Sequence, residues 1–154
     1  MTFSNPEIYL LTGFCGLPFG STKADAEKLF GKPEEVQLLE DEVLNNSSVV
    51  FHYWDAGYSL FFDKRRQELF TSVELDNRDA ILYENKIFSL REKELTELML
   101  RNGHRLSDSE VHEWGEKRLS FDSAGLDCYF ENNRLATVNF GLIEAYDSYT
   151  IFQN

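Results

Sequence analysis

One pattern of residues occurs twice in this chain, and it constrains the fold more than any local feature does. Asp55–Asp63 matches Ser123–Glu131 at a constant offset of 68 residues, and Phe70–Leu75 matches Leu135–Phe140 at an offset of 65. Each copy holds an Ala-Gly turn followed by two alternating strands. Self-similarity at a fixed spacing indicates a duplicated structural unit.

The repeat sets the domain organisation that we expect. A chain of 154 residues is the size of one domain, since domains usually hold about 100–200 residues. We therefore predict a single domain over residues 1–154, with an internal repeat of about residues 13–77 and 78–142.

A capped helix is expected at the start of each unit. Thr22 precedes an amphipathic run from Lys23 to Phe30, with Asp25 three residues after the cap, and Gly31 follows the run. In the second unit, Ser89–Glu92 reads as a capping box, and the helix that it opens should run to about Asn102.

Antiparallel strands should follow each helix. In the first unit, three runs of β-branched and aromatic residues are separated by connectors short enough for hairpins. These runs are Val49–Trp54, Tyr58–Asp63 and Leu69–Leu75, with further strands expected at Glu35–Leu39 and Ala80–Phe88. The order of elements predicts an α+β fold made of two tandem units, each a helix followed by an antiparallel meander.

Composition and charge restrict the function classes. The chain is 42% hydrophobic and carries 27 acidic against 15 basic residues, for a net charge of −12. An acidic field repels phosphate backbones and anionic lipid headgroups, so we expect no nucleic-acid and no membrane partner. A protein partner is favoured, and a basic one in particular.

Targeting and redox signals favour a cytoplasmic protein. The apolar run Ile8–Leu11 is too short for the core of a signal peptide, and no stretch approaches the roughly 20 apolar residues of a membrane span. Cys15 and Cys128 stand far apart and outside any CxxC pattern, which is typical of small buried side chains in a reducing compartment.

Several short motifs resemble the unit of β-lactamase inhibitory protein-like domains. They are the helix entry Gly16–Ser21, the helix exit Leu29–Val36, the aromatic pair Tyr53–Trp54 and the hairpin Gly57–Asp63. The resemblance implies one curved antiparallel sheet from two tandem units, with the helices on one face and a protein partner on the other. It also implies that the chain acts as an inhibitor or as a cytosolic immunity protein against a toxin. The chain departs from the secreted inhibitor in having neither its signal peptide nor its disulfides.

Alternation along the strands separates two faces of the expected sheet. One set is consistently apolar and should lie under the helices: Phe51, Tyr53, Tyr58, Leu60, Phe62, Leu119, Phe121, Leu126, Cys128 and Phe130. The opposite set mixes aromatics with carboxylates and gives the candidate partner-binding residues: His52, Trp54, Phe61, Phe70, Glu74, Asp127, Tyr129 and Glu131. Aromatic anchors rimmed by charge are favoured in protein interfaces. The alternative is that Leu39–Ser48 or Ile143–Phe152 packs over these aromatics.

No motif of a catalytic or cofactor site is complete. The glycine-rich run Gly13–Thr22 lacks the Gly-Lys-[Ser/Thr] ending of a phosphate loop. His112–Glu116 resembles the start of a zinc helix but has Glu116 where the second histidine is needed. We expect neither a metal nor a cofactor, and no catalytic residues.

A stretch of the chain holds four carboxylates close together in sequence. Asp108, Glu110, Glu113 and Glu116 form a metal or acid/base cluster in one interpretation and a solvated acidic loop in the other, which we favour.

The function predicted from these features is a non-catalytic protein-binding domain that uses the open sheet face, with an inhibitor or toxin-immunity protein as its specific form. The alternative is a small-molecule-binding or catalytic domain with a pocket between the sheet and the loops. A third hypothesis is an interaction module without an inhibitory role.

Overall fold

The fold is mostly β-structure, as seen in a computed structural model that describes residues 5–41, 43 and 46–143. Strands make up 46% of the described residues and helices 20%, and the strands form two sheets, of five and eight strands. The predicted α+β fold class is therefore wrong, and so is the prediction of one sheet built from helix-then-meander units.

The larger sheet is antiparallel throughout and has the strand order β10-β11-β12-β13-β7-β6-β5-β4. Its first four strands in the chain are β4 (Glu35–Asp41), β5 (Asn46–Tyr53), β6 (Tyr58–Asp63) and β7 (Leu69–Leu75). The other four are β10 (Asp108–Val111), β11 (Glu116–Phe121), β12 (Leu126–Glu131) and β13 (Arg134–Gly141).

The smaller sheet has the order β3-β2-β1-β8-β9 and consists of very short strands. They are β1 (Glu7–Tyr9), β2 (Gly13–Phe14), β3 (Leu17–Pro18), β8 (Ile81–Leu82) and β9 (Asn85–Lys86). Because strands of two or three residues show no alternation, the sequence pattern does not reveal this sheet. The predicted strand Ala80–Phe88 is instead the β8–β9 hairpin and a 3₁₀ turn, η2 (Ile87–Ser89).

Two α-helices occur among the described residues, and the sequence placed both of them. Helix α1 (Lys23–Phe30) begins with the predicted capping box, in which Thr22 Oγ1 accepts from Asp25 N and Asp25 Oδ2 accepts from Thr22 N. Helix α2 spans Glu92–Arg101.

The predicted capping box at the start of α2 is wrong. Ser89 ends η2 and donates its hydroxyl to Lys86 O, so it is not available as a cap. Arg91 stands at the N-cap position, and its backbone N–H donates to Glu94 Oε1 at 2.9 Å.

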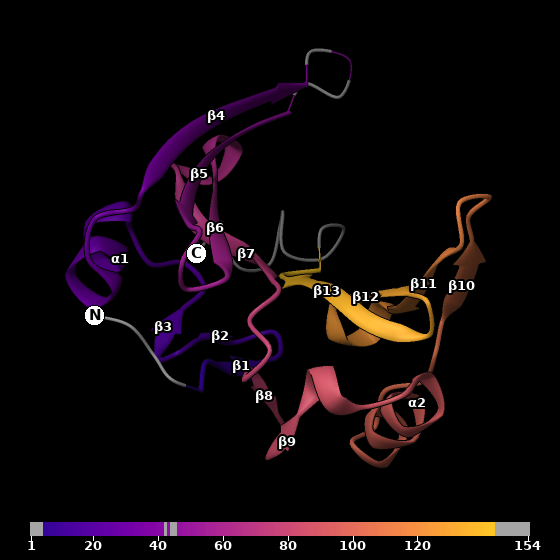
Figure 1. Ribbon diagram of the computed structural model, residues 1–154. Helices are drawn as coiled ribbons and strands as arrows, with labels where there is room; N and C mark the ends of the chain where they lie inside the picture. The colour runs from indigo at the N-terminus through magenta and orange to yellow at the C-terminus, as the bar shows by residue number, and fades with distance from the viewer. Residues whose placement is uncertain (1–4, 42, 44–45, 144–154) are drawn as a thin grey trace.

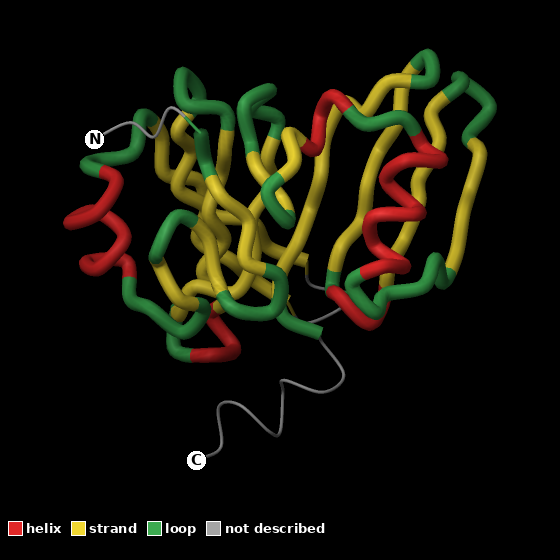
Figure 2. Tube along the Cα trace, turned by 90° about the horizontal axis from the view of Figure 1, so that it is seen from below, coloured by secondary structure: helices red, strands yellow, loops and turns green. Residues whose placement is uncertain are grey.

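The helices and the smaller sheet lie on the same side of the larger sheet. Figure 1 shows α1, the smaller sheet and α2 below the larger sheet, which runs from β4 at the upper left to β10 at the right. Figure 2 views this covered side, with α1 and α2 at its two ends. The uncovered side is called the outer face below.

Aromatic side chains fill the space between the two sheets. Phe14 on β2 is fully buried, and its ring lies 5.0 Å from that of Tyr58, 6.1 Å from Phe30 on α1 and 5.8 Å from Phe140. All ten residues predicted for the covered face of the larger sheet are buried. Alternation therefore gave the correct inner face of the sheet.

The two halves of the larger sheet meet at equivalent positions of the sequence repeat. Strands β7 and β13 are the central pair, and Glu74 lies directly opposite Asn139, its counterpart at the offset of 65. Each half also has a register shift at the same place, between Phe61 and Phe62 and between Tyr129 and Phe130, which are 68 residues apart.

Two segments that were interpreted as loops belong to strands. Within Leu39–Ser48, the described residues 39–41 and 46–48 belong to β4 and β5, whose pairing extends to Asp41 opposite Asn46, and they continue the sheet. Asp108–Val111 forms the edge strand β10 instead of a solvated loop. The other segment considered as a cover, Ile143–Phe152, lies outside the described residues after Ile143.

Candidate functional site on the outer face

A row of polar residues crosses the outer face from one edge of the larger sheet to the other. Cross-strand pairing places one residue of each strand in this row, and on the six inner strands the neighbours along the strand are buried in the core. We call it the central row: Glu35, His52, Ser59, Glu74, Asn139, Asp127, Ser120 and Asp108. A face that turns away from the core is expected to be polar, but this one also has three partly exposed aromatics beside the row.

His52 anchors the half of the row that belongs to β4–β7. Its ring is buried, with Nδ1 2.7 Å from Ser59 Oγ and Nε2 2.8 Å from Gln37 Oε1. Trp54 stacks on the imidazole with ring centres 4.1 Å apart and donates its indole N–H to Glu35 Oε1. The indole is thereby fixed in place although 57% of Trp54 is exposed.

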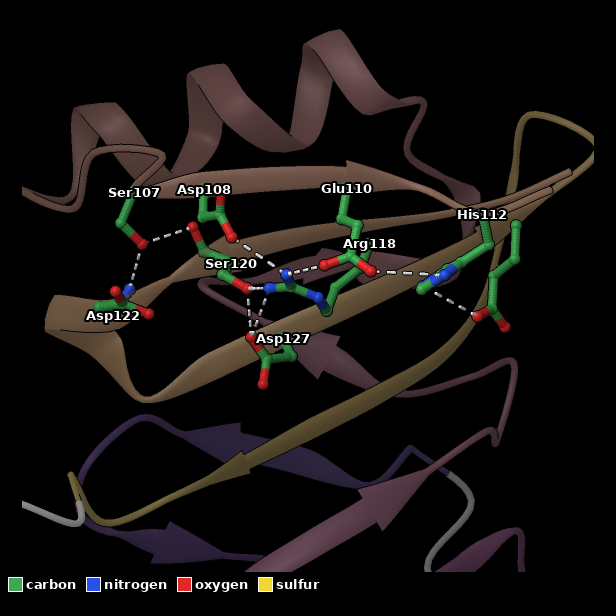
Figure 3. Close-up of polar contacts among 9 residues, drawn as sticks. Ser107, Asp108, Glu110, His112, Arg118, Ser120, Asp122 and Asp127 are labelled. Carbon is green, nitrogen blue, oxygen red and sulfur yellow. Dashed lines mark hydrogen bonds and ion pairs between the residues drawn. The ribbon is translucent and has the colours of Figure 1, made fainter.

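Arg118 organises the half of the row that belongs to β10–β13 (Figure 3). Its guanidinium donates to Asp108 Oδ2 and Glu110 Oε2 at 3.0 Å each and to Ser120 Oγ, and Asp127 Oδ1 lies 3.9 Å away. Ser120 in turn donates to Asp127 Oδ1 at 2.6 Å. The hydrogen bonds that Arg118 donates to Asp108 and Glu110 raise the pKa of its guanidinium. This network neutralises only part of the negative charge around it.

A pocket of about 310 Å³ lies on the outer face over the central strand pair. Its polar groups are Glu74, Asp127 and Asn139 from the central row, and Phe61 forms an aromatic wall. A second hollow of about 170 Å³ shares Glu74 with the pocket and is lined further by Trp54 and Asp76. Of the described residues that line the two hollows, none is Lys or Arg, so both are acidic.

The structure places seven of the eight predicted partner-binding residues on the outer face. Glu74 and Glu131 are exposed there, and Phe61, Asp127 and Tyr129 are partly exposed. His52 is on this face but buried beneath Trp54. Burial and the neighbouring Asp127 raise the pKa of Tyr129, so its hydroxyl stays protonated at neutral pH.

Phe70 was assigned to the wrong face. It is fully buried and packs against Phe62 and Phe19, with ring centres 5.9 and 4.9 Å away. The register shift between Phe61 and Phe62 adds a residue to β7, so that Phe62 pairs with Phe70 while Phe61 pairs with Ser72. Strict alternation fails across such a bulge, and Phe70 turns to the core.

The sequence interpretation missed several polar residues of the face, among them Arg118, Ser120 and Asn139. Arg118 and Ser120 alternate with the core residues Leu119 and Phe121, and this alternation was the signal that could have placed them outside. Asn139 could have been found as the repeat counterpart of Glu74.

The described residues offer few groups for metal binding or nucleophilic catalysis. Among them, no cluster of three or more His, Cys, Asp or Glu side chains is arranged to hold a metal ion. Burial raises the pKa of the Cys15 thiol to about 12 and raises that of the Cys128 thiol as well, which makes both poor nucleophiles at neutral pH. Within the same part of the chain, no helix has the length and apolar character needed to traverse a bilayer.

Comparison with known proteins identifies similar structures but assigns this chain to no family. No protein-family profile matches the chain, and no curated protein matches it. A crystal structure of a DUF4309 family protein, YjgB from Bacillus subtilis subsp. subtilis str. 168, aligns over 82% of both chains at 14% identity with a TM-score of 0.47. An extracellular protein containing a SCP domain from Bacillus anthracis str. Ames aligns at 12% identity and the same TM-score, over 82% of this chain and 45% of that one.

Proposed function

We propose that this chain is a non-catalytic domain that binds a basic protein partner on its outer face. The observation that carries the proposal is the pair of adjoining acidic hollows that share Glu74, with Trp54 and Phe61 as partly exposed aromatics in their walls. Rigid aromatics next to complementary charge provide binding energy and select the partner. The net charge of −12 favours fast association with a basic surface.

Inhibition or toxin immunity in the cytoplasm is the specific form of this function that we favour. The resemblance of the helix-entry and hairpin motifs to β-lactamase inhibitory protein-like domains supports it. So does the fixed geometry of the Trp54 indole, since a preorganised anchor loses little entropy on binding.

A second candidate is the binding of a small cationic molecule. It is favoured by the convergence of two carboxylates, Glu74 and Asp127, on one pocket of about 310 Å³. This volume is at the lower end of the range for small-molecule sites, roughly 300–1,000 Å³.

Site-specific photo-crosslinking in the native cell tests the leading proposal. A benzophenone amino acid is placed at Trp54 on the outer face and, in a matched variant, at Leu100 on α2; both residues are 57% exposed in the wild-type chain. We expect one crosslinked protein from the Trp54 position and none from Leu100. When a lysate is irradiated instead of intact cells, the yield of the product should fall as the ionic strength before irradiation is raised, because charge attracts the partner.

Equal crosslinking from the two positions would locate binding elsewhere and contradict the proposal. The absence of any protein adduct from the outer face, with the variant folded and abundant, would favour the small-molecule alternative.

A further inference from the structure

The shape of the larger pocket follows from two glycines beside the central row. Phe61, Ser72 and Gly141 lie opposite one another on β6, β7 and β13, and Gly141 N donates to Gly125 O at 3.0 Å. Gly125 and Gly141 both line the pocket, and they contribute backbone atoms and no side chain to it. A Cβ atom at Gly141 would stand 2.5 Å from Thr71 O, so backbone packing keeps the position as glycine. The hollow is therefore built into the sheet.

The polar groups around this hollow are mainly hydrogen-bond acceptors. The side-chain carboxylate of Glu74 has no hydrogen-bond or ion-pair partner within the described part of the chain. Asn139 Oδ1 is buried and also lacks a partner there. Asp127 uses Oδ1 to accept from Ser120. Two carboxylates on a hollow that no described Lys or Arg lines attract a cationic ligand with several N–H groups.

We infer that this pocket binds the guanidinium group of an arginine side chain of the protein partner, an inference that rests on the proposed function. A guanidinium carries five donors in one plane, enough to serve the carboxylates of Glu74 and Asp127 together. Its flat face also stacks on an aromatic ring, which Phe61 supplies at the pocket wall. A lysine ammonium neutralises the carboxylates but is compact and cannot make the same bidentate and stacked contacts.

The test uses N-acetyl-arginine N-methylamide as the probe, titrated into the ¹⁵N-labelled full chain at fixed ionic strength. The lysine compound and the uncharged citrulline compound serve as comparisons. We expect amide shifts centred on Glu74, Asp127 and Asn139, with the arginine probe binding more tightly than the lysine one. The citrulline probe should bind at least about tenfold more weakly, because charge-assisted hydrogen bonds are lost.

Charge-matched variants show whether the pocket itself is responsible. Glu74→Gln should weaken binding of the arginine probe about tenfold, whereas Glu97→Gln, which removes the same charge from the exposed surface of α2, should leave it unchanged. Phe61→Leu should reduce the preference for arginine over lysine. Thermal unfolding of each variant confirms that it is folded.

Equal affinity for the arginine and citrulline probes, or equal weakening by Glu74→Gln and Glu97→Gln, would overturn the inference. Crosslinking from Trp54 without arginine binding would leave the proposed function in place and remove only the pocket assignment. Arginine binding without any crosslinked protein would overturn the proposed function, and with it the assignment of the arginine to a partner.

Discussion

The ring of Phe14 meets the ring of Tyr58 edge to face, with 5.0 Å between their centres, and so joins the smaller sheet to the larger one. Edge-to-face pairs add to the free energy gained by burying the two rings. Neither sheet could bury its apolar side without this contact layer, so its loss should be felt by the whole domain.

Phe14→Ala should therefore lower the free energy of unfolding by about 3–5 kcal/mol, the usual cost of truncating a fully buried phenylalanine. Urea denaturation monitored by circular dichroism measures the change. Leu100→Ala, at a side chain that is 57% exposed, is the control and should cost less than about 0.5 kcal/mol. A similar cost for the two variants would show that the rings do not hold the sheets together.

Arg66→Ala should be about as destabilising, for an electrostatic reason. Arg66 and Asp63 form an ion pair of 2.6 Å with only 7% and 10% of their side chains exposed. Removing the arginine leaves the carboxylate of Asp63 without its main partner, which costs about 3–5 kcal/mol for a buried pair. Arg65, 40% exposed and 3.5 Å from the same carboxylate, provides the control. Arg65→Ala should cost under about 1 kcal/mol in the same denaturation assay.

The stability of the domain should fall in alkaline solution. Burial raises the pKa of Tyr53 from 10 to about 12 and that of Cys15 from 9 to about 12. The unfolded chain loses these protons first, so the native state holds more protons above pH 9 and its stability decreases with rising pH. Denaturation curves between pH 7 and 11 measure the slope, which should be shallower in Tyr53→Phe. Parallel curves for wild type and variant would contradict the assignment.

Both thiols should be unreactive in the native state. A pKa of about 12 at Cys15 leaves roughly a thousandfold less thiolate at pH 8 than the ordinary value of 9 would, and Cys128 is completely buried. Titration with a chromogenic disulfide should give a slow reaction for the folded chain and two thiols at once in guanidinium chloride. A fast native reaction that disappears in Cys15→Ser would show that Cys15 is accessible.

The sequence carried enough information for the long elements of the fold. Strands β6 and β7 and helix α1 begin and end at the predicted residues, because a capping box at Thr22 and alternation along each strand are local signals. The same alternation separated the covered face of the larger sheet from the outer one. The smaller sheet could not be predicted from the sequence, because its strands are too short to show a period. These strands are held by the tertiary contacts that their own core residues, such as Phe14 and Leu82, make.

The candidate site was predictable in its residues but not in its arrangement. Glu74 and Asp127 were identified from their place in the alternation, yet their convergence on one pocket depends on the pairing of β7 with β13, strands about 60 residues apart that no local pattern joins. Phe70 went to the wrong face because one bulge, invisible in the sequence, shifts the alternation. The single-domain boundaries and the internal repeat remain predictions.

The pairing of Glu74 with Asn139 has one more consequence. At the middle of the sheet, where equivalent positions of the two halves lie opposite each other, one carries a negative charge and the other a neutral amide. A peptide segment of a partner that crosses from β7 to β13 therefore meets the charged position first, and a segment that crosses in the opposite direction meets the neutral one first. This difference gives the outer face a polarity, and a partner would be held in one orientation and disfavoured in the reverse.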